Sequence, residues 1–88
     1  MANIKSQIKR NRQNERLRAR NRAFRSELRT RARNALAAAE AGDAAGAEEA
    51  LRLAQMRIDA AAAKGVLPKN TAARRKSRLT KQVRALLG

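Results

Sequence analysis

The sequence of 88 residues contains no cysteine, histidine, tryptophan or tyrosine, and only one phenylalanine. Without cysteine and histidine the chain cannot ligate zinc as zinc fingers do, and it lacks the usual Cys/His and Ser/His nucleophile arrangements. The single aromatic residue, Phe24, excludes the stacking surfaces of the common single-strand RNA modules and of OB-folds. We expect Phe24 to pack in a core with Leu28. The sequence predicts no enzyme, no metal site, no cofactor and no small-molecule substrate.

Acidic residues and long apolar runs are also scarce. Seven acidic residues are set against twenty-two basic ones, which gives a formal net charge of +15. No apolar run approaches the length of a transmembrane helix, and no apolar region follows Lys5, Lys9 and Arg10, so we expect neither a membrane span nor a signal peptide. We therefore expect a cytoplasmic protein. The high charge favours a polyanionic partner, which is either nucleic acid or an anionic membrane.

Charge divides the chain into three blocks. Residues 1–33 carry twelve basic and two acidic side chains, residues 34–63 carry two and five, and residues 64–88 carry eight and none. Gly42 and the stretch 65–68 interrupt long segments of good helix formers near these boundaries. The pattern predicts a single domain, 1–88, with an all-α fold: an antiparallel three-helix bundle with helices at about 6–41, 44–64 and 68–87. The first helix should project beyond the bundle.

Several residues have the preferences of helix ends. They are Asn3 or Ser6 and Gly42 for the first helix, Asp43 and Lys64–Gly65 for the second, and Pro68 or Asn70 for the third. Gly46 is a weak choice near the start of the second helix, because glycine costs about 1 kcal/mol relative to alanine in a helix interior.

Apolar side chains recur at three- and four-residue spacings along each helix, which is typical of one buried face. The expected core positions are Leu17, Phe24, Leu28, Ala32, Ala35, Leu36 and Ala39, then Ala47, Ala50, Leu51, Ala54, Met56, Ile58 and Ala61, with Leu53 to the side, and finally Ala72, Leu79, Val83 and Leu86. No large apolar residue lies between Ile8 and Leu17. We therefore expect residues 5–16 to be disordered in the free protein and helical when bound to a partner.

The basic residues of the first helix form two rows on different faces. The rows are Arg18, Arg22, Arg25, Arg29 and Arg33, and Lys9, Arg12, Arg16 and Arg20. A helix that lies on a membrane needs an apolar face opposite its cationic face, and residues 9–16 offer none. Arginine predominates over lysine, and its planar fork can bridge two phosphates or pair with a guanine edge, which favours nucleic acid.

The same charge allows other interpretations. A basic run is often a solvated helix face, but eleven cations between Lys9 and Arg33 with only two acids would repel one another in an isolated helix. A histone-like DNA-compacting protein is an alternative on charge alone, and a cationic membrane-active peptide is a third possibility. A long rod charged on several faces favours a folded RNA that surrounds it over a single duplex.

Several short motifs, in their order and spacing, carry a resemblance to a known family. They are Ala2-Asn3-Ile4-Lys5-Ser6 with Lys9-Arg10, Arg25-Ser26 followed by Arg29-Thr30, Ala41-Gly42-Asp43, Lys64-Gly65, and Lys69-Asn70 followed by Ala72-Ala73-Arg74-Arg75-Lys76-Ser77-Arg78-Leu79. Almost from end to end, the chain resembles the bacterial small-subunit ribosomal protein numbered twenty. The resemblance implies a three-helix bundle with an extended first helix, which binds small-subunit (16S) ribosomal RNA directly during early assembly and bridges more than one RNA domain.

The expected RNA-binding residues combine the two cationic rows with motif positions that the resemblance implies. They are Lys5, Ser6, Lys9, Arg10, Arg12, Arg16, Arg18, Arg20, Arg22, Arg25, Ser26, Arg29, Arg33, Lys69, Asn70, Arg74, Arg75, Lys76, Ser77 and Arg78. The expected partners are this RNA and neighbouring ribosomal components in the cytoplasm, with no membrane and no second copy of the chain.

Overall fold

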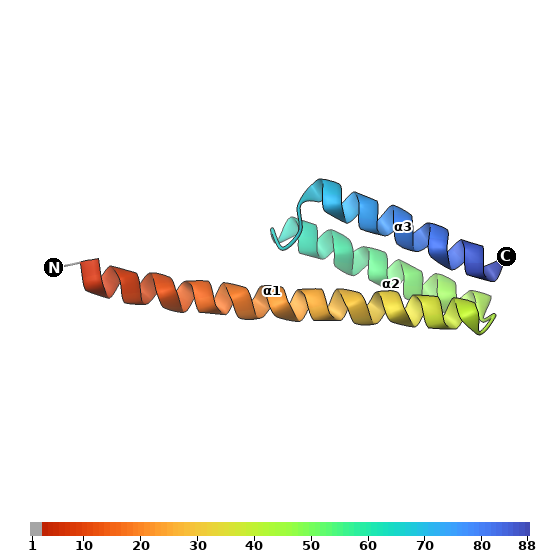
Figure 1. The fold of residues 1–88 in the computed structure, drawn as a ribbon, viewed down its shortest axis with the longest axis horizontal. Coiled ribbons are helices and arrows are strands. Elements are labelled where there is room, and N and C mark those ends of the chain that lie inside the picture. Colours follow the sequence, from red (N-terminus) through yellow and green to blue (C-terminus); the bar gives the residue numbers. More distant parts are fainter. Residues whose placement is uncertain (1–2) are drawn as a thin grey trace.

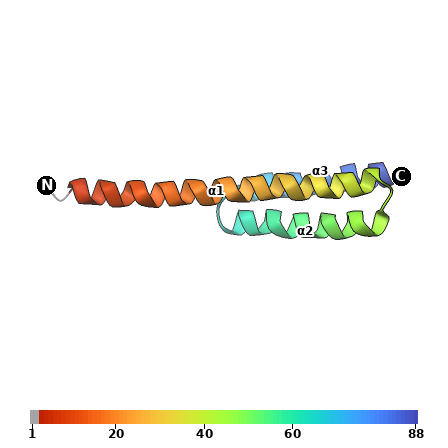
Figure 2. The same cartoon turned by 90° about the horizontal axis from the view of Figure 1, so that it is seen from below.

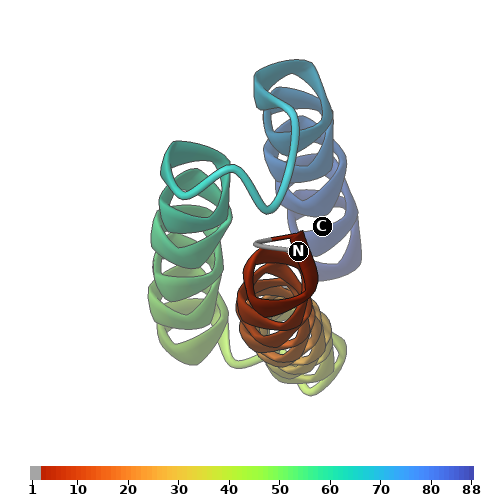
Figure 3. The ribbon, with the colours of Figure 1, turned by 90° about the vertical axis from the view of Figure 1, so that its left-hand side faces the viewer.

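A computed structural model describes residues 3–88, so Ala2 of the first motif lies outside the described residues. Three helices make up this range: α1 (Asn3–Glu40), α2 (Ala44–Ala63) and α3 (Lys69–Leu87), and it contains no strand. Helix α2 runs back along α1, and α3 returns in the direction of α1 (Figure 1). Seen end-on, the three helices stand at the corners of a triangle (Figure 3). The expected all-α, antiparallel three-helix bundle is confirmed.

Helix α1 is far longer than its partners and extends beyond them. It has 38 residues, against 20 in α2 and 19 in α3. At 1.5 Å per residue α1 is about 57 Å long, and the whole molecule measures 65 × 21 × 13 Å. Every side chain from Ile4 to Arg20 is exposed. We call residues 4–20 the overhang, which Figures 1 and 2 show projecting past the bundle as expected.

The ends of α1 and α2 share one turn geometry. Gly42 and Gly65 each follow the helix with a φ of +76°, a left-handed conformation that glycine adopts without strain. The backbone N–H of the residue after each glycine donates to a carbonyl five residues back, at 3.0 and 2.9 Å respectively. This Schellman arrangement satisfies helix-terminal carbonyls that otherwise lack partners. Helix α1 begins at Asn3, three residues before the expected start at Ser6.

The carboxylate of Asp43 caps the start of α2, as its residue type indicates. It accepts a hydrogen bond from the backbone N–H of Gly46 at 3.0 Å. A Cβ at position 46 would collide with this carboxylate, so glycine leaves room for the cap. A cap contributes about 1 kcal/mol, which offsets the cost expected for glycine. Pro68 precedes α3 without a side-chain cap, and Asn70 lies inside the helix and does not cap it.

Two apolar clusters form the core. The first contains Phe24, Leu28, Ile58, Ala61, Val66, Leu67 and Ala72, and the second contains Ala35, Ala39, Ala47, Leu51, Ala54, Leu79 and Val83. Val66 and Leu67 lie in the connection between α2 and α3, where helical periodicity gives no signal. The connection therefore closes the end of the bundle that faces the overhang.

Three residues that we expected in the core are exposed instead. Leu17 and Leu86 are each 46% exposed, and Met56 is 59% exposed. Leu17 lies on the overhang, where no partner helix covers it, and Met56 lies on the outward side of α2. Leu86 is in the last turn of α3, where its neighbour Leu87 packs against the second cluster instead. The packed part of α1 consequently begins at Phe24, two turns later than expected.

Candidate nucleic-acid interface

The residues expected to bind RNA lie almost entirely on the surface. Nineteen of these twenty residues are exposed, and only Lys76 is partly buried. On an ideal helix with 3.6 residues per turn, the two arginine rows of α1 are centred about 140° apart. No partner helix lies beside the overhang, which carries the row from Lys9 to Arg20 (Figures 1 and 2). A single ligand surface on one side of the helix therefore cannot contact both rows.

The fold brings the row that runs from Arg18 to Arg33 close to α3. Arg29 of α1 and Arg75 and Arg78 of α3 line the same groove between these helices. The other row stays on the overhang, and only its last member reaches the bundle, because Arg20 donates a hydrogen bond to the carbonyl oxygen of Lys64 at 3.2 Å. The expected site thus forms two cationic surfaces rather than one.

Lys76 lies apart from both surfaces. Its Nζ is 2.8 Å from Oδ1 of Asp59 on α2, so the ammonium is already paired with a carboxylate. The hydroxyl of Thr80 donates to the carbonyl oxygen of Lys76 and accepts from the amide of Gln55, both at 2.8 Å. These contacts hold this side of α3 against α2. The Asp59 carboxylate neutralises part of the Lys76 charge, so Lys76 should attract a phosphate less strongly than the unpaired arginines do.

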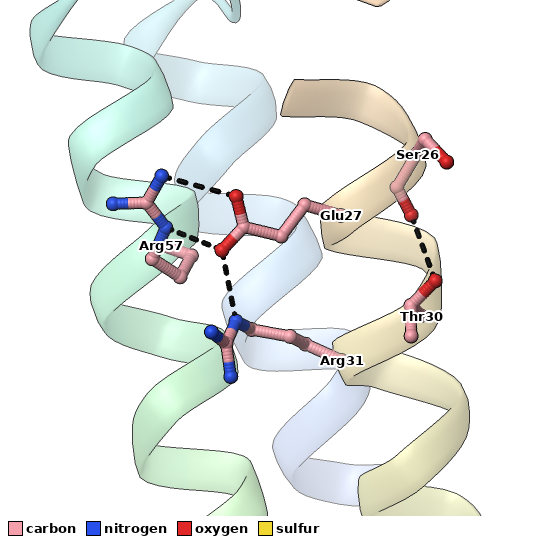
Figure 4. A network of polar contacts seen from close by, with 5 residues as sticks. All are labelled: Ser26, Glu27, Thr30, Arg31 and Arg57. Carbon is pink, nitrogen blue, oxygen red and sulfur yellow. Dashed lines mark hydrogen bonds and ion pairs between the residues drawn. The ribbon is translucent and has the colours of Figure 1, made fainter. Parts of the chain in front are cut away.

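A second polar network joins α1 to α2 around Glu27 (Figure 4). The Arg57 guanidinium donates two hydrogen bonds to the Glu27 carboxylate, at 2.7 and 3.1 Å, and Nε of Arg31 donates a third at 3.0 Å. The Arg57 guanidinium also lies 4.9 Å from the centroid of the Phe24 ring, in cation–π geometry. Two arginines are therefore held by protein groups, and they act in packing. The i,i+4 spacing of Glu27 and Arg31 predicts the contact between these two residues. Nothing in the sequence predicts the contact between Glu27 and Arg57.

The pH dependence of the unfolding free energy should show how much this network stabilises the fold. Hydrogen bonds from Arg57, and next from Arg31, lower the pKa of Glu27 below its ordinary value. A carboxylate with a lowered pKa stabilises the fold above its unfolded-state pKa, and this contribution is lost as pH falls through the folded-state pKa. We expect Glu27→Gln to lose about 1 kcal/mol of unfolding free energy at neutral pH, because the pair is partly exposed. Urea unfolding at several pH values measures this loss.

The matched control is Glu40→Gln, at the exposed end of α1. It should leave stability at neutral pH nearly unchanged. The difference between the wild type and Glu27→Gln should shrink below about pH 4.3, the ordinary pKa of glutamate. A difference that stays constant down to pH 3 would contradict the assignment of the lowered pKa to Glu27.

The rest of the described chain offers little chemistry of other kinds. Within residues 3–88, no three or more Asp and Glu side chains gather as a metal site would require. None of the three helices is both long enough and apolar enough to cross a membrane. The exposed arginines remain the most prominent chemical feature of the surface.

Comparison with known proteins identifies the family of the chain that carries this surface. Residues 2–84 match the model of the family described as ribosomal protein S20. The chain belongs to the ribosomal protein S20 family. It is 55% identical over 86 residues to the small ribosomal subunit protein bS20 of Beutenbergia cavernae, covering 98% of this chain and 100% of that relative. The bS20 proteins of Cutibacterium acnes and Mycobacterium tuberculosis are each 54% identical over 86 residues, covering 98% of this chain and 98% and 100% of those relatives.

Membership of the S20 family confirms the family resemblance that the sequence motifs carry. It places the chain among ribosomal proteins, which act in the cytoplasm. The match covers the overhang, the rest of α1, α2 and all but the last three residues of α3, so the long first helix belongs to the family region as much as the bundle does.

Proposed function

We propose that this protein is a structural component of the small ribosomal subunit that binds 16S ribosomal RNA directly and aids its assembly. It neutralises converging phosphates and holds RNA segments at a fixed separation. Helix α1 carries this proposal, because its two cationic rows face different directions and every side chain of residues 4–20 is exposed. Its relatives are small ribosomal subunit proteins, which supports the same conclusion.

Binding to RNA and to duplex DNA, measured across salt concentrations, tests the proposal. Each neutralised phosphate releases counterions, so the affinity should fall steeply as salt rises. At physiological salt we expect tighter binding to small-subunit ribosomal RNA than to a DNA duplex, because one duplex cannot contact both rows. Equal affinity for the two would contradict the proposal and favour a histone-like DNA-compacting protein. Sedimentation should show a monomer in the absence of RNA.

RNA should also determine the structure of the overhang. Every side chain of residues 5–16 is exposed, so core packing does not stabilise the helix there, and its like charges repel one another. We expect this segment to exchange its amide hydrogens rapidly in the free protein and to gain protection and helical circular dichroism on binding RNA. Hydrogen exchange resolved by residue makes this measurement.

The packed half of α1 supplies the internal control for that experiment. Residues 24–39 include four core side chains, so their amides should be protected with and without RNA. Strong protection of residues 5–16 in the free protein would show that helix formation there precedes binding.

A further inference from the structure

A shallow groove of about 160 Å³ lies between α1 and α3. Its apolar floor comes from all three helices and consists of Leu28, Ala32, Leu36, Ile58 and Leu79. The groove lies where the two core clusters meet, because Leu28 and Ile58 belong to the first cluster and Leu79 belongs to the second. The small side chain of Ala32 leaves space at this junction.

The rim of the groove is cationic. Arg29 of α1 and Arg75 and Arg78 of α3 line it together with Gln82, and no carboxylate does. Within residues 3–88, none of these three arginines forms a hydrogen bond or an ion pair with another residue. By contrast, Arg31 and Arg57 are paired with the Glu27 carboxylate. The rim therefore presents unpaired guanidinium groups above an apolar surface.

The size and chemistry of the groove restrict its occupant. Its volume lies between the roughly 30 Å³ of a water molecule and the roughly 300 Å³ of the smallest drug-sized pockets. An occupant should be apolar and flat where it meets the floor and anionic where it meets the rim. An unpaired nucleotide has this form, and guanidinium planes stack on bases when aromatic side chains are absent. The amide of Gln82 can hydrogen-bond to a base edge.

We propose that the groove receives one unpaired nucleotide of the bound RNA, with its base on the apolar floor and its phosphates against Arg29, Arg75 and Arg78. This inference rests on the proposed function. Two observations favour RNA over a protein segment: the rim lacks carboxylates, and Arg29 belongs to the exposed row that continues through Arg25 and Arg33. A strand of RNA that follows this row therefore reaches the mouth of the groove.

The substitution Ala32→Leu tests the proposal, because it fills the groove without changing any charge. At about 25 cal/mol per Å², burial of about 60 Å² of the apolar face of a base on this floor corresponds to a factor of about ten in affinity. We expect Ala32→Leu to bind small-subunit ribosomal RNA about tenfold more weakly at every salt concentration, with an unchanged salt dependence, since no phosphate contact is lost. Base-specific chemical probing should show that an unpaired base protected by the wild type loses its protection, while hydroxyl-radical protection of the backbone persists.

Controls separate the possible outcomes. Ala37→Leu adds the same side chain at an exposed position of α1 outside the groove and should bind normally. Circular dichroism should show that both variants fold, and Ala32→Met fills the groove with a more adaptable side chain if leucine prevents folding. Unchanged affinity and unchanged base protection in a folded Ala32→Leu variant would overturn the inference. If that variant also failed to recruit another ribosomal protein, the groove would hold a protein segment instead of a nucleotide. If the wild type gave no backbone protection at all, the proposed function itself would fail.

Discussion

An Arg25→Glu variant should bind small-subunit ribosomal RNA about ten- to a hundredfold more weakly than the wild type. Arg25 is exposed on the row of α1 that runs beside α3, and no protein group holds it. A hydrogen bond to a charged group contributes roughly 1.5–3 kcal/mol, and 1.4 kcal/mol corresponds to a factor of ten. The substituted carboxylate would in addition repel the phosphate. Titration of labelled RNA at several salt concentrations measures both the affinity and its salt dependence.

The salt dependence shows whether a phosphate contact was lost. Removal of one phosphate contact should reduce the slope of log affinity against log salt by about one. The unfolding midpoint in urea should change little, because the side chain contacts no core residue. We expect Arg75→Glu to behave in the same way from the α3 side of the same surface.

Arg52→Glu is the matched control, since it changes the net charge equally on the exposed surface of α2. Helix α2 carries none of the residues that we expect to bind RNA. If Arg52→Glu weakened binding as much as Arg25→Glu, affinity would depend on net charge alone rather than on a defined surface. Loss of folding in Arg25→Glu, without a binding defect in the folded fraction, would refute the role assigned to Arg25.

The sequence predicts the fold class because its signals are local. Glycine at 42 and 65, proline at 68 and the shift from basic to acidic composition mark the two turns without any knowledge of tertiary contacts. The family resemblance gives the same arrangement. The length of the overhang was less predictable, because periodicity identifies the face of a helix that is apolar but not how far its neighbours extend along it. Leu17 shares a face with Phe24, yet Leu17 is 46% exposed whereas Phe24 is 8% exposed.

The two ion pairs between helices depend on the register of one helix against another, which cannot be read from a single sequence. Nothing in the spacing of Arg57 or Lys76 indicates that one meets Glu27 and the other meets Asp59. The sequence consequently names the basic residues of the expected site but does not predict how they are arranged in space. The structure divides that list into the row on the overhang, the surface that α1 shares with α3, and a lysine that is paired with Asp59.

A Phe24→Ala variant should lose about 3–5 kcal/mol of unfolding free energy, which is the usual cost of truncating a buried phenylalanine. Phe24 is 8% exposed and is the first core residue of α1, in the cluster that joins α1 to α2 and to the connection before α3. Its removal also eliminates the ring beneath the Arg57 guanidinium. At about 0.05–0.15 kcal/mol per residue, a chain of this length is stable by roughly 4–13 kcal/mol, and the many alanines in its clusters favour the low end of that range. A large fraction of the variant should therefore be unfolded at room temperature in the absence of RNA.

Leu17→Ala is the comparison that locates the start of the packed region. Leu17 is 46% exposed, so its truncation should change the unfolding free energy by less than about 0.5 kcal/mol. RNA should restore the fold of Phe24→Ala at a correspondingly higher concentration, because a ligand that binds only the folded state stabilises it by mass action. Equal destabilisation by the two truncations would mean that the bundle packs along α1 as far as Leu17. The boundary between the protein core and the RNA-dependent overhang would then lie two turns closer to the amino terminus.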